Sequence, residues 1–379
     1  MSASSLETRS LSLLRKLMLI SWPAVLVLAL VAAVGAVMLY SAANGHIDPW
    51  ASRQLVRFAV ALVFLVAVAV IDPRLWFRHA YLVYGGALLL LVAVEVMGDI
   101  GLGAQRWLDI GVIRLQPSEI MKIALVLALA RYFHGVESED IGDLKRLLVP
   151  AVMILAPAAL VLRQPDLGTA MILGAVGAVM FYLAGVRLWK FMVVGGAGLA
   201  MIPLAWQFLR DYQKARILTF LDPERDPLGA GYHILQSKIA LGSGGTFGKG
   251  FLQGSQSHLN FLPEKQTDFI FTMLAEEWGL VGGLALLFLY ILVIGWGVTV
   301  ALRSRNQFGR LLSLGVVTTF FLYVFINIAM VMGLLPIVGV PLPLVSYGGT
   351  SMLTLMVGMG LVMGVAVHRD QPLTRYGPD

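Results

Sequence analysis

The sequence contains no cysteine, which excludes disulfide bonds, thiol nucleophiles and thiolate metal sites. Charge is scarce as well. Only 13% of the 379 residues are charged, whereas a soluble domain carries about 25%. The hydrophobic residues make up 58% of the chain, and they gather in blocks of roughly 17–25, the length that crosses a bilayer as a helix. The composition therefore predicts one polytopic, all-α membrane domain.

Ten apolar segments each predict a membrane-spanning helix. They cover 17–40, 55–71, 78–97, 117–133, 147–162, 168–184, 189–209, 269–299, 308–331 and 347–367. The first follows basic residues as a signal peptide does, but it is too long for a typical signal sequence and we expect it to be retained. The eighth carries Glu276, Glu277 and Gly279 near its start. We expect a short half-helix there that turns at Gly279 before the span proper.

The distribution of basic residues predicts the orientation of these spans, because cytoplasmic loops are enriched in Lys and Arg. With a cytoplasmic N-terminus, five basic residues fall in the short outer loops: Arg53, Arg57, Arg106, Arg114 and Arg163. Fifteen fall in cytoplasmic segments: Arg9, Arg15, Lys16, Arg74, Arg78, Arg131, Lys145, Arg146, Arg187, Lys190, Arg303, Arg305, Arg310, Arg369 and Arg375. Both termini are therefore expected inside and the large loop 210–266 outside. Basic residues that flank spans favour lipid headgroups over nucleic acid as partners.

Ionisable residues at membrane depth indicate either a functional site or a buried pair. In "LQPSEIMKIAL" (115–125), Pro117 suits the first turn of a helix and Ser118 is a candidate cap. Glu119 and Lys122 lie three residues apart on one helical face and can pair, either as a structural ion pair or as a polar wall of a substrate cavity. In "RQPDLGT" (163–169), Asp166 is a candidate helix cap or site residue.

The large outer loop is rich in glycine and contains a potential short helix at 230–241. Its stretch "GSGGTFGKG" does not fit the phosphate-binding P-loop, because the glycine and the Ser or Thr that the motif needs are missing at 243 and 250. Two interpretations stay open. Backbone N–H groups near Lys238 and Lys249 can cradle an anion, or the glycines simply allow a tight turn.

The stretch "PEKQTDFIF" (263–271) places Asp268 where a polar loop meets an apolar run. Thr267 or Asp268 can cap the helix that follows. Capping does not explain why Glu276 and Glu277 follow so closely, so a site is the alternative. Other chemistries lack their motifs: the sequence has no HExxH and no GxSxG, and its six scattered histidines argue against a histidine metal site.

Four stretches together resemble the SEDS family of bacterial proteins (shape, elongation, division and sporulation), over about residues 12–370. They are "GAQRWLDIGVIRLQPSEIMKIAL", "RQPDLGTA", "LPEKQTDFIFTMLAEEWGLVGG" and "NIAMVMGLLPIVGVPLPLVSYGGTS". The last fits the family's C-terminal signature, from Asn327 to Ser351. "RWLDIG" and "LPEKQTDFIF" are more similar to the rod-shape elongation members than to the division members.

The resemblance implies a peptidoglycan glycosyltransferase of the bacterial cytoplasmic membrane that polymerises lipid II beside a class B penicillin-binding protein and the cell-elongation machinery. The family's essential aspartate matches Asp268, and its paired acid and base match Glu119 and Lys122. Its "QPDLGT" aspartate matches Asp166. Gln266 stands where many relatives have histidine, so no catalytic role is carried to it.

For such a reaction we expect Asp268 to act as general base in one inverting displacement. Lys122, Arg106 and Lys238, with or without a divalent cation such as Mg²⁺ or Mn²⁺, are candidates to stabilise the leaving pyrophosphate. Two alternatives stay open: a flippase that carries lipid II across the membrane, and a non-catalytic scaffold for the penicillin-binding protein.

Overall fold

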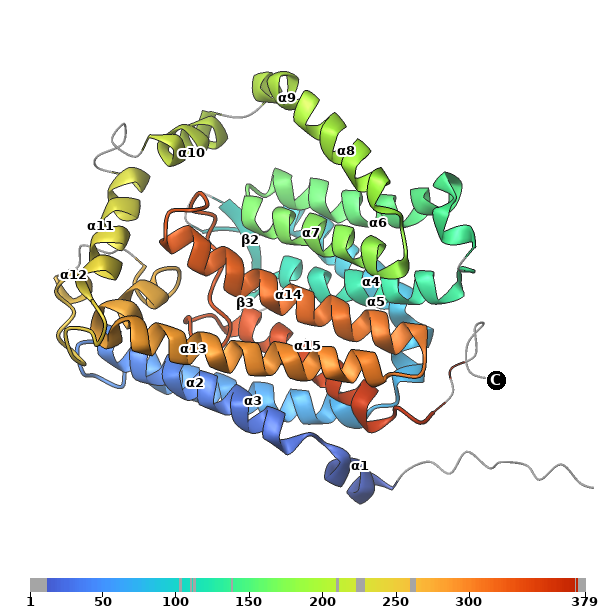
Figure 1. Cartoon of the computed structure of the whole chain (residues 1–379), viewed down its shortest axis with the longest axis horizontal. Coiled ribbons are helices and arrows are strands. Elements are labelled where there is room, and N and C mark those ends of the chain that lie inside the picture. Colours follow the sequence, from blue (N-terminus) through green and yellow to red (C-terminus); the bar gives the residue numbers. More distant parts are fainter. Residues whose placement is uncertain are drawn as a thin grey trace, which may run out of the picture.

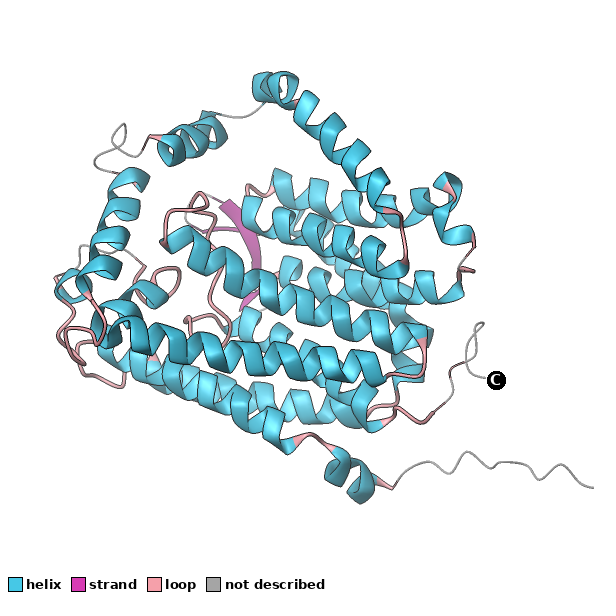
Figure 2. Ribbon diagram, in the orientation of Figure 1, coloured by secondary structure: helices cyan, strands magenta, loops and turns pink. Residues whose placement is uncertain are grey.

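The long helices of the chain lie side by side in one bundle (Figure 1). The computed structural model describes residues 12–101, 104–109, 111, 114–137, 139–208, 211–222, 229–259, 264–371 and 373. Among these residues, strands occur only in one short stretch near one end of the bundle (Figure 2). The all-α membrane fold expected from composition is therefore confirmed, with a small sheet in addition.

The first half of the chain builds the lower and rear parts of the bundle in Figure 1, together with the sheet. The strands pair antiparallel in the order β1-β2-β3. The elements are α1 (Leu13–Leu19), α2 (Trp22–Ala42), α3 (Ala51–Val70), α4 (Pro73–Met97), β1 (Asp99–Gly101), β2 (Ala104–Asp109), β3 (Arg114–Leu115), α5 (Pro117–Gly135), a 3₁₀ turn η1 (Asp140–Gly142) and α6 (Leu144–Arg163).

The second half adds the large outer connection and the central helices. Its elements are α7 (Leu167–Ala184), α8 (Leu188–Ala200), α9 (Ile202–Phe208), α10 (Asp211–Leu221), α11 (Ala230–Ser243), α12 (Ser255–His258), α13 (Ile270–Arg303), α14 (Gln307–Val331) and α15 (Gly349–Val367). The short helix expected at 230–241 is thus present as α11. Pro117 opens α5, as expected for a first-turn proline.

Eight of the described helices are long and apolar enough to cross a membrane: α2, α3, α4, α6, α7, α13, α14 and α15. The other two predicted spans correspond to different structures. Helix α5 has the length but carries Glu119, Lys122 and Arg131, and its middle turns are fully buried among neighbouring helices. The segment 189–209 is divided between α8 and α9. A count of ten spans remains a prediction.

Helix α14 lies at the centre of the bundle, where it packs against α5, α7, α13 and α15. Helix α15 packs in turn on α3, α13 on α2, and α4 on α5. Helix α1 and the last described residues lie at one end of the bundle, and α11 and α12 lie at the other (Figure 1). The first and last described segments thus lie at the same end, as an even number of spans requires, and α11 and α12 of the large connection lie at the opposite end.

Helix α13 is broken at Gly279, whose φ of 68° and ψ of −163° are not helical. The half-helix expected before Gly279 is therefore confirmed. A break in a membrane helix exposes backbone groups that need partners, and the loop after α11 supplies them. The Lys249 and Gly250 N–H groups donate to the carbonyl oxygens of Glu276 and Glu277, at 3.0 and 3.1 Å.

The glycines of this loop allow that close contact. Gly248 has a φ of +79°, and a Cβ there would lie 2.1 Å from the Glu277 carbonyl oxygen. Any larger residue would separate the loop from α13. Of the two interpretations of "GSGGTFGKG", the structure supports the tight turn, because N–H groups of this stretch are directed at helix carbonyls.

Candidate active site

Asp268 lies in a turn, residues 264–269, that leads into α13. Its side chain is half buried and makes no hydrogen bond or ion pair with the residues that the structure describes. Burial, followed by repulsion from Glu264, raises the pKa of the Asp268 carboxyl from 3.8 to about 6. A carboxylate without partners and with a raised pKa is suited to accept a proton near neutral pH.

The segment 333–348, which joins α14 to α15, holds this turn in place. Ser346 Oγ donates to the Thr267 carbonyl oxygen at 2.6 Å, and the Tyr347 N–H donates to the Gln266 carbonyl oxygen at 2.8 Å. Gly339, with a φ of +67°, approaches the acid so closely that a Cβ would lie 3.5 Å from an Asp268 carboxylate oxygen. The C-terminal sequence signature therefore forms one wall around Asp268.

Two capping hypotheses are wrong. Phe269 occupies the N-cap of α13 and provides no side-chain bond, while Thr267 donates its hydroxyl to the Glu264 carbonyl oxygen at 3.2 Å. Neither Thr267 nor Asp268 therefore caps the helix, because the chain forms a local turn first. At α5 the N-cap is Gln116 rather than Ser118, also without a side-chain bond.

Asp166 caps α7, as one of its two interpretations predicted. Its Oδ1 accepts from the Thr169 N–H at 3.1 Å and its Oδ2 accepts from the Thr169 hydroxyl at 2.9 Å. The side chain is buried, and its charge acts both on Asp268 and on Tyr323 of α14. Asp166 therefore acts electrostatically both on the turn of Asp268 and on α14. It remains a candidate site residue although it also caps α7.

Glu119 and Lys122 form a buried ion pair on α5, with 2.7 Å between Lys122 Nζ and Glu119 Oε1. Tyr323 completes the group. Its hydroxyl donates to Glu119 Oε2 at 2.6 Å and accepts from Lys122 Nζ, and the Lys122 Nζ lies 4.5 Å from the centre of its ring. Sequence reasoning missed Tyr323, because a tyrosine within an apolar helix carries no signal of its own.

The two other expected cations are placed differently. Arg106 of β2 donates to the carbonyl oxygens of Gln164, at 3.3 Å, and Pro165. Its positive charge lowers the pKa of Asp268 and so partly opposes burial. Lys238 of α11 is exposed and lies against Gly333. A Cβ added at Gly333 would lie only 2.3 Å from Lys238 Cε. Arg106 thus acts on the carboxylate through its charge without forming an ion pair, whereas Lys238 contacts the segment after α14.

Glu276 and Glu277 belong to a separate cluster. Glu276 Oε1 accepts from Lys249 Nζ at 2.8 Å and from the Gln256 N–H at 2.9 Å. Glu277 Oε1 accepts from Ser41 Oγ at 2.5 Å and contacts His258 Nε2 at 3.0 Å. Both side chains are fully buried. These acids attach the outer loop and α2 to the half-helix.

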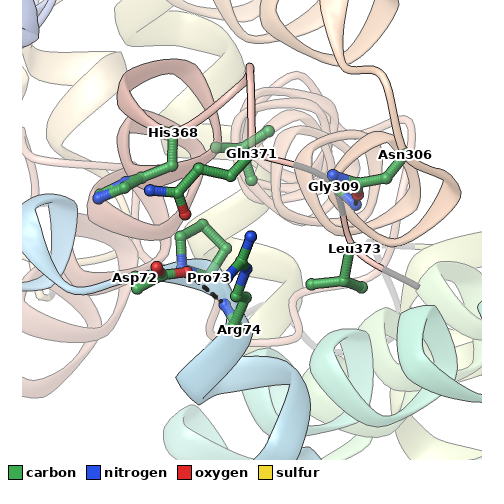
Figure 3. Close-up of a pocket in the computed structure, with 9 residues that line it drawn as sticks. Asp72, Pro73, Arg74, Asn306, Gly309, His368, Gln371 and Leu373 are labelled. Atoms are coloured by element: carbon green, nitrogen blue, oxygen red, sulfur yellow. Dashed lines mark hydrogen bonds between the residues drawn. The ribbon is translucent and has the colours of Figure 1, made fainter. Parts of the chain in front are cut away.

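A small pocket lies at the opposite end of the bundle from Asp268. Residues from the α3–α4 junction, the start of α14 and the end of α15 converge there, and they include Asp72, Asn306 and His368 (Figure 3). No group of three or more His, Cys, Asp or Glu side chains suited to a metal occurs in the described ranges. The polar cluster around Asp268 is therefore the candidate active site.

Known proteins share both the sequence and the fold. The family model named for FtsW, RodA and SpoVE, with the description "Cell cycle protein", matches residues 15–371. The chain is 47% identical to the peptidoglycan glycosyltransferase MrdB of Escherichia coli K12, over 92% of this chain and 94% of that protein. It is 33% identical to the peptidoglycan glycosyltransferase RodA of Treponema pallidum, over 88% of this chain and 94% of that protein.

Solved structures give the same result. A structure described as "Structural coordination of polymerization and crosslinking by a peptidoglycan synthase complex" matches with a TM-score of 0.81 and 34% identity, over 93% of this chain and 99% of that chain. The rod shape determining protein RodA of Thermus thermophilus matches with a TM-score of 0.70 and 30% identity, over 93% and 98%. The chain therefore belongs to the FtsW, RodA and SpoVE family, the SEDS proteins that its motifs resemble.

Proposed function

We propose that this membrane protein is a peptidoglycan glycosyltransferase that polymerises lipid II at the outer face of the bacterial cytoplasmic membrane. The family and the names of the relatives support the enzyme class. The observation that carries the catalytic assignment is the Asp268 carboxyl, which is half buried, without a partner among the described residues, and has a pKa raised to about 6.

The proposed reaction is one inverting displacement. The 4-hydroxyl oxygen of the acceptor sugar attacks the anomeric carbon of the donor and forms a β-1,4 glycosidic bond. The bond from that carbon to the pyrophosphate oxygen breaks, and undecaprenyl pyrophosphate leaves with the electron pair. The hydroxyl proton passes to Asp268. Base catalysis of this kind contributes about 10²–10⁴-fold to the rate, and the anionic leaving group needs no strong acid.

Cationic groups of this chain would stabilise the charge that develops on the pyrophosphate. Lys122 is held by Glu119 and Tyr323, and Arg106 of β2, which is bonded to the turn before α7, acts on the site through its charge. Lys238, at Gly333, would serve from the outer side. We assign substrate contacts to these three cations and to Glu119 and Asp166. The acids in the described ranges form no group suited to a divalent cation, so every step is assigned to side chains of this chain.

A penicillin-binding protein is the expected partner. The structure matched at a TM-score of 0.81 is that of a peptidoglycan synthase complex in which polymerisation and crosslinking are coordinated. We propose that this chain supplies glycan strands to a class B transpeptidase of the elongation machinery. Similarity to proteins named MrdB and RodA favours elongation over division.

The test is polymerisation of lipid II by the purified chain and its transpeptidase partner in detergent, with glycan strands separated by length on a gel. The wild-type chain should produce strands and Asp268→Asn should produce none. Asp109→Asn provides a matched control, because Asp109 is an exposed acid paired with Arg114 on the neighbouring strand.

Each alternative predicts a different result. A flippase makes no strands in detergent, where no sealed compartment exists, so strands made by the wild-type chain exclude a purely transporting role. A non-catalytic scaffold also makes no strands beside a transpeptidase, and it predicts that Asp268→Asn leaves cell-wall synthesis in cells intact. Full activity of Asp268→Asn would reject the base assignment.

A further inference from the structure

One face of α14 faces both parts of the candidate site, which are the turn of Asp268 and the buried Lys122–Glu119 pair. Thr319, Tyr323 and Asn327 follow each other at intervals of four residues, so they lie on the same side of the helix, about one turn apart. All three are buried. Since α14 packs against α5, α7 and α13, this face meets the helices that carry the Lys122–Glu119 pair, Asp166 and the turn of Asp268.

Asn327 fixes the backbone of the catalytic turn. Its side-chain Nδ2 donates one hydrogen bond to the Asp268 carbonyl oxygen at 3.0 Å and another to the Val340 carbonyl oxygen at 2.8 Å. One amide therefore joins the turn that carries the acid to the segment beside Gly339 that flanks its carboxylate. Both bonds cross between elements that are more than ten residues apart in the chain, so no local structure replaces them.

Tyr323 fixes the cation of the site. Lys122 Nζ has three protons, and two of its donated bonds go to Glu119 Oε1 and to the Tyr323 hydroxyl. The Tyr323 hydroxyl then donates its own proton to Glu119 Oε2 at 2.6 Å. This closed ring of three groups determines the direction of the remaining N–H of Lys122. A lysine without the tyrosine would keep its charge and lose that direction.

We propose that Tyr323 and Asn327 are positioning residues, and that a single turn of α14 holds the base and the pyrophosphate-binding lysine at a fixed separation. The proposal rests on the proposed function, because it assigns Asp268 and Lys122 the roles given above. Its physical basis is that an attacking hydroxyl and a leaving group must be aligned at once, and a misplacement of about 1 Å can cost about 100-fold in rate.

Three substitutions on this face separate positioning from general packing. Tyr323→Phe removes one hydroxyl and keeps the ring. Asn327→Leu removes both donated bonds and keeps the number and branching of the side-chain heavy atoms. Thr319→Val is the matched control: Thr319 is equally buried on the same face, but its hydroxyl bonds only to the Gly315 carbonyl oxygen of its own helix, at 2.9 Å.

We expect a different kinetic signature from each variant in the lipid II assay. Asn327→Leu should lower kcat by about 10–100-fold, because release of the turn misplaces the base and a misplacement of about 1 Å can cost about 100-fold in rate. It should also move the acid limb of the pH–rate profile to lower pH as the freed turn becomes hydrated. The charged groups that act on Asp268 from its surroundings are Glu264, Arg106 and Asp166, and this variant leaves all of them in place.

Tyr323→Phe should raise the KM for lipid II by about tenfold and leave the acid limb unchanged, because Asp268 keeps its surroundings. Thr319→Val should match wild type in kcat, KM and acid limb. Melting temperatures of the three variants are measured in the same detergent, so that rates are compared at an equal folded fraction.

The proposal is overturned if both site variants match Thr319→Val in all three kinetic quantities. If Asn327→Leu does not fold, Tyr323→Phe decides alone, and an unchanged KM rejects the proposal. Asp268→Asn is assayed in parallel. If Asp268→Asn is active, the proposed function and this inference are both rejected. If Asp268→Asn is inactive while Tyr323→Phe and Asn327→Leu both behave like Thr319→Val, only the inference is rejected.

Discussion

Three carboxylates, those of Asp268, Glu276 and Glu277, occur within ten residues, and the surroundings of the first differ from those of the other two. Glu276 and Glu277 are fully buried and are bonded to Lys249, Ser41 and His258, among other groups. The Asp268 carboxylate is only half buried and has no such partner within the described chain. The three acids lie close together in the chain, where a polar loop meets an apolar helix. Two of them are nevertheless buried and hydrogen-bonded, and the third is not.

The difference separates two acids with structural partners from one whose surroundings suit the proposed role of base. Buried charges are tolerated when they are paired and hydrogen-bonded. Glu276 meets that condition through Lys249. Glu277 meets it through Oε1, which contacts Ser41 and His258, whereas its Oε2 is buried without a partner among the described residues. Asp268 does not meet it and retains a raised pKa. Hydrogen bonds from Asn327 and Ser346 hold the backbone of the turn that carries Asp268. The Asp268 carboxylate itself has no hydrogen bond to the described residues.

The largest expected effect of this difference is on activity. Asp268→Asn should lower lipid II polymerisation by at least about 10²-fold, the lower range for loss of a general base, and should leave the melting temperature unchanged or raised because a buried charge is removed. Polymerisation gels and thermal denaturation in detergent measure the two quantities. A variant that loses both activity and stability would place Asp268 with the structural acids.

The reverse pattern is expected for the other two acids. Glu276→Ala and Glu277→Ala should each lower the free energy of unfolding by about 2–4 kcal/mol, because buried donors and charges lose their partner. The fraction that remains folded should polymerise lipid II at the wild-type rate. Denaturant titration gives the stability, and specific activity per folded protein gives the rate. Inactive but stable Glu277→Ala would show that the cluster takes part in catalysis.

The sequence could predict the fold class, the break at Gly279 and the helix at 230–241, because apolar run length, glycine and periodicity are local signals. It also brought Asp166, Glu119 and Lys122 into consideration, since ionisable groups in apolar runs are rare. Local chemistry left Asp268 level with Glu276 and Glu277, and only the family resemblance put Asp268 first. A physical ranking depends on partners such as Ser41, which lies 236 residues away from Glu277 in the chain.

The same reason explains the errors. Capping by Thr267 or Ser118 is a local inference, and tertiary bonds from Ser346 and Tyr347 instead hold the turn before α13 in a non-helical form. Tyr323 and Asn327 gave no signal of their contacts because their partners belong to other elements: Tyr323 bonds to α5, and Asn327 bonds to the turn before α13 and to the segment after α14. The small sheet at 99–115 also went unpredicted, since its strands have only two to six residues.

A third prediction concerns pH. A base with a pKa near 6 should give a polymerisation rate that is halved near pH 6 and falls about tenfold for each further unit of acid, where an ordinary aspartate would remain active below pH 5. The pH–rate profile of kcat/KM measures this limb. An acid limb near pH 4 would show that the carboxylate is solvated like a surface aspartate.

The free energy of unfolding should fall over the pH range in which the polymerisation rate rises. Because the pKa of folded Asp268 is raised above 3.8, the protonated acid contributes stability that is fully present below about pH 4 and is lost as the pH rises through about 6. The wild-type chain should therefore lose stability relative to Asp268→Asn between these values. Equal pH dependence of the two melting temperatures would contradict the raised pKa.

The smallest effect should come from a single bond in the structural cluster. Ser41 is fully buried on α2 and donates to Glu277 at 2.5 Å, so Ser41→Ala should lower the free energy of unfolding by about 1–2 kcal/mol without a change in rate. Thr299→Ala is the matched control, because its exposed hydroxyl bonds only to the Gly295 carbonyl oxygen of the same helix. Glu277 keeps its contact with His258 in Ser41→Ala, so the loss should be smaller than in Glu277→Ala. If Ser41→Ala lost as much stability as Glu277→Ala, the Ser41 hydroxyl alone would account for the attachment of α2 to the half-helix. The other contacts of Glu277 would then contribute nothing measurable to stability.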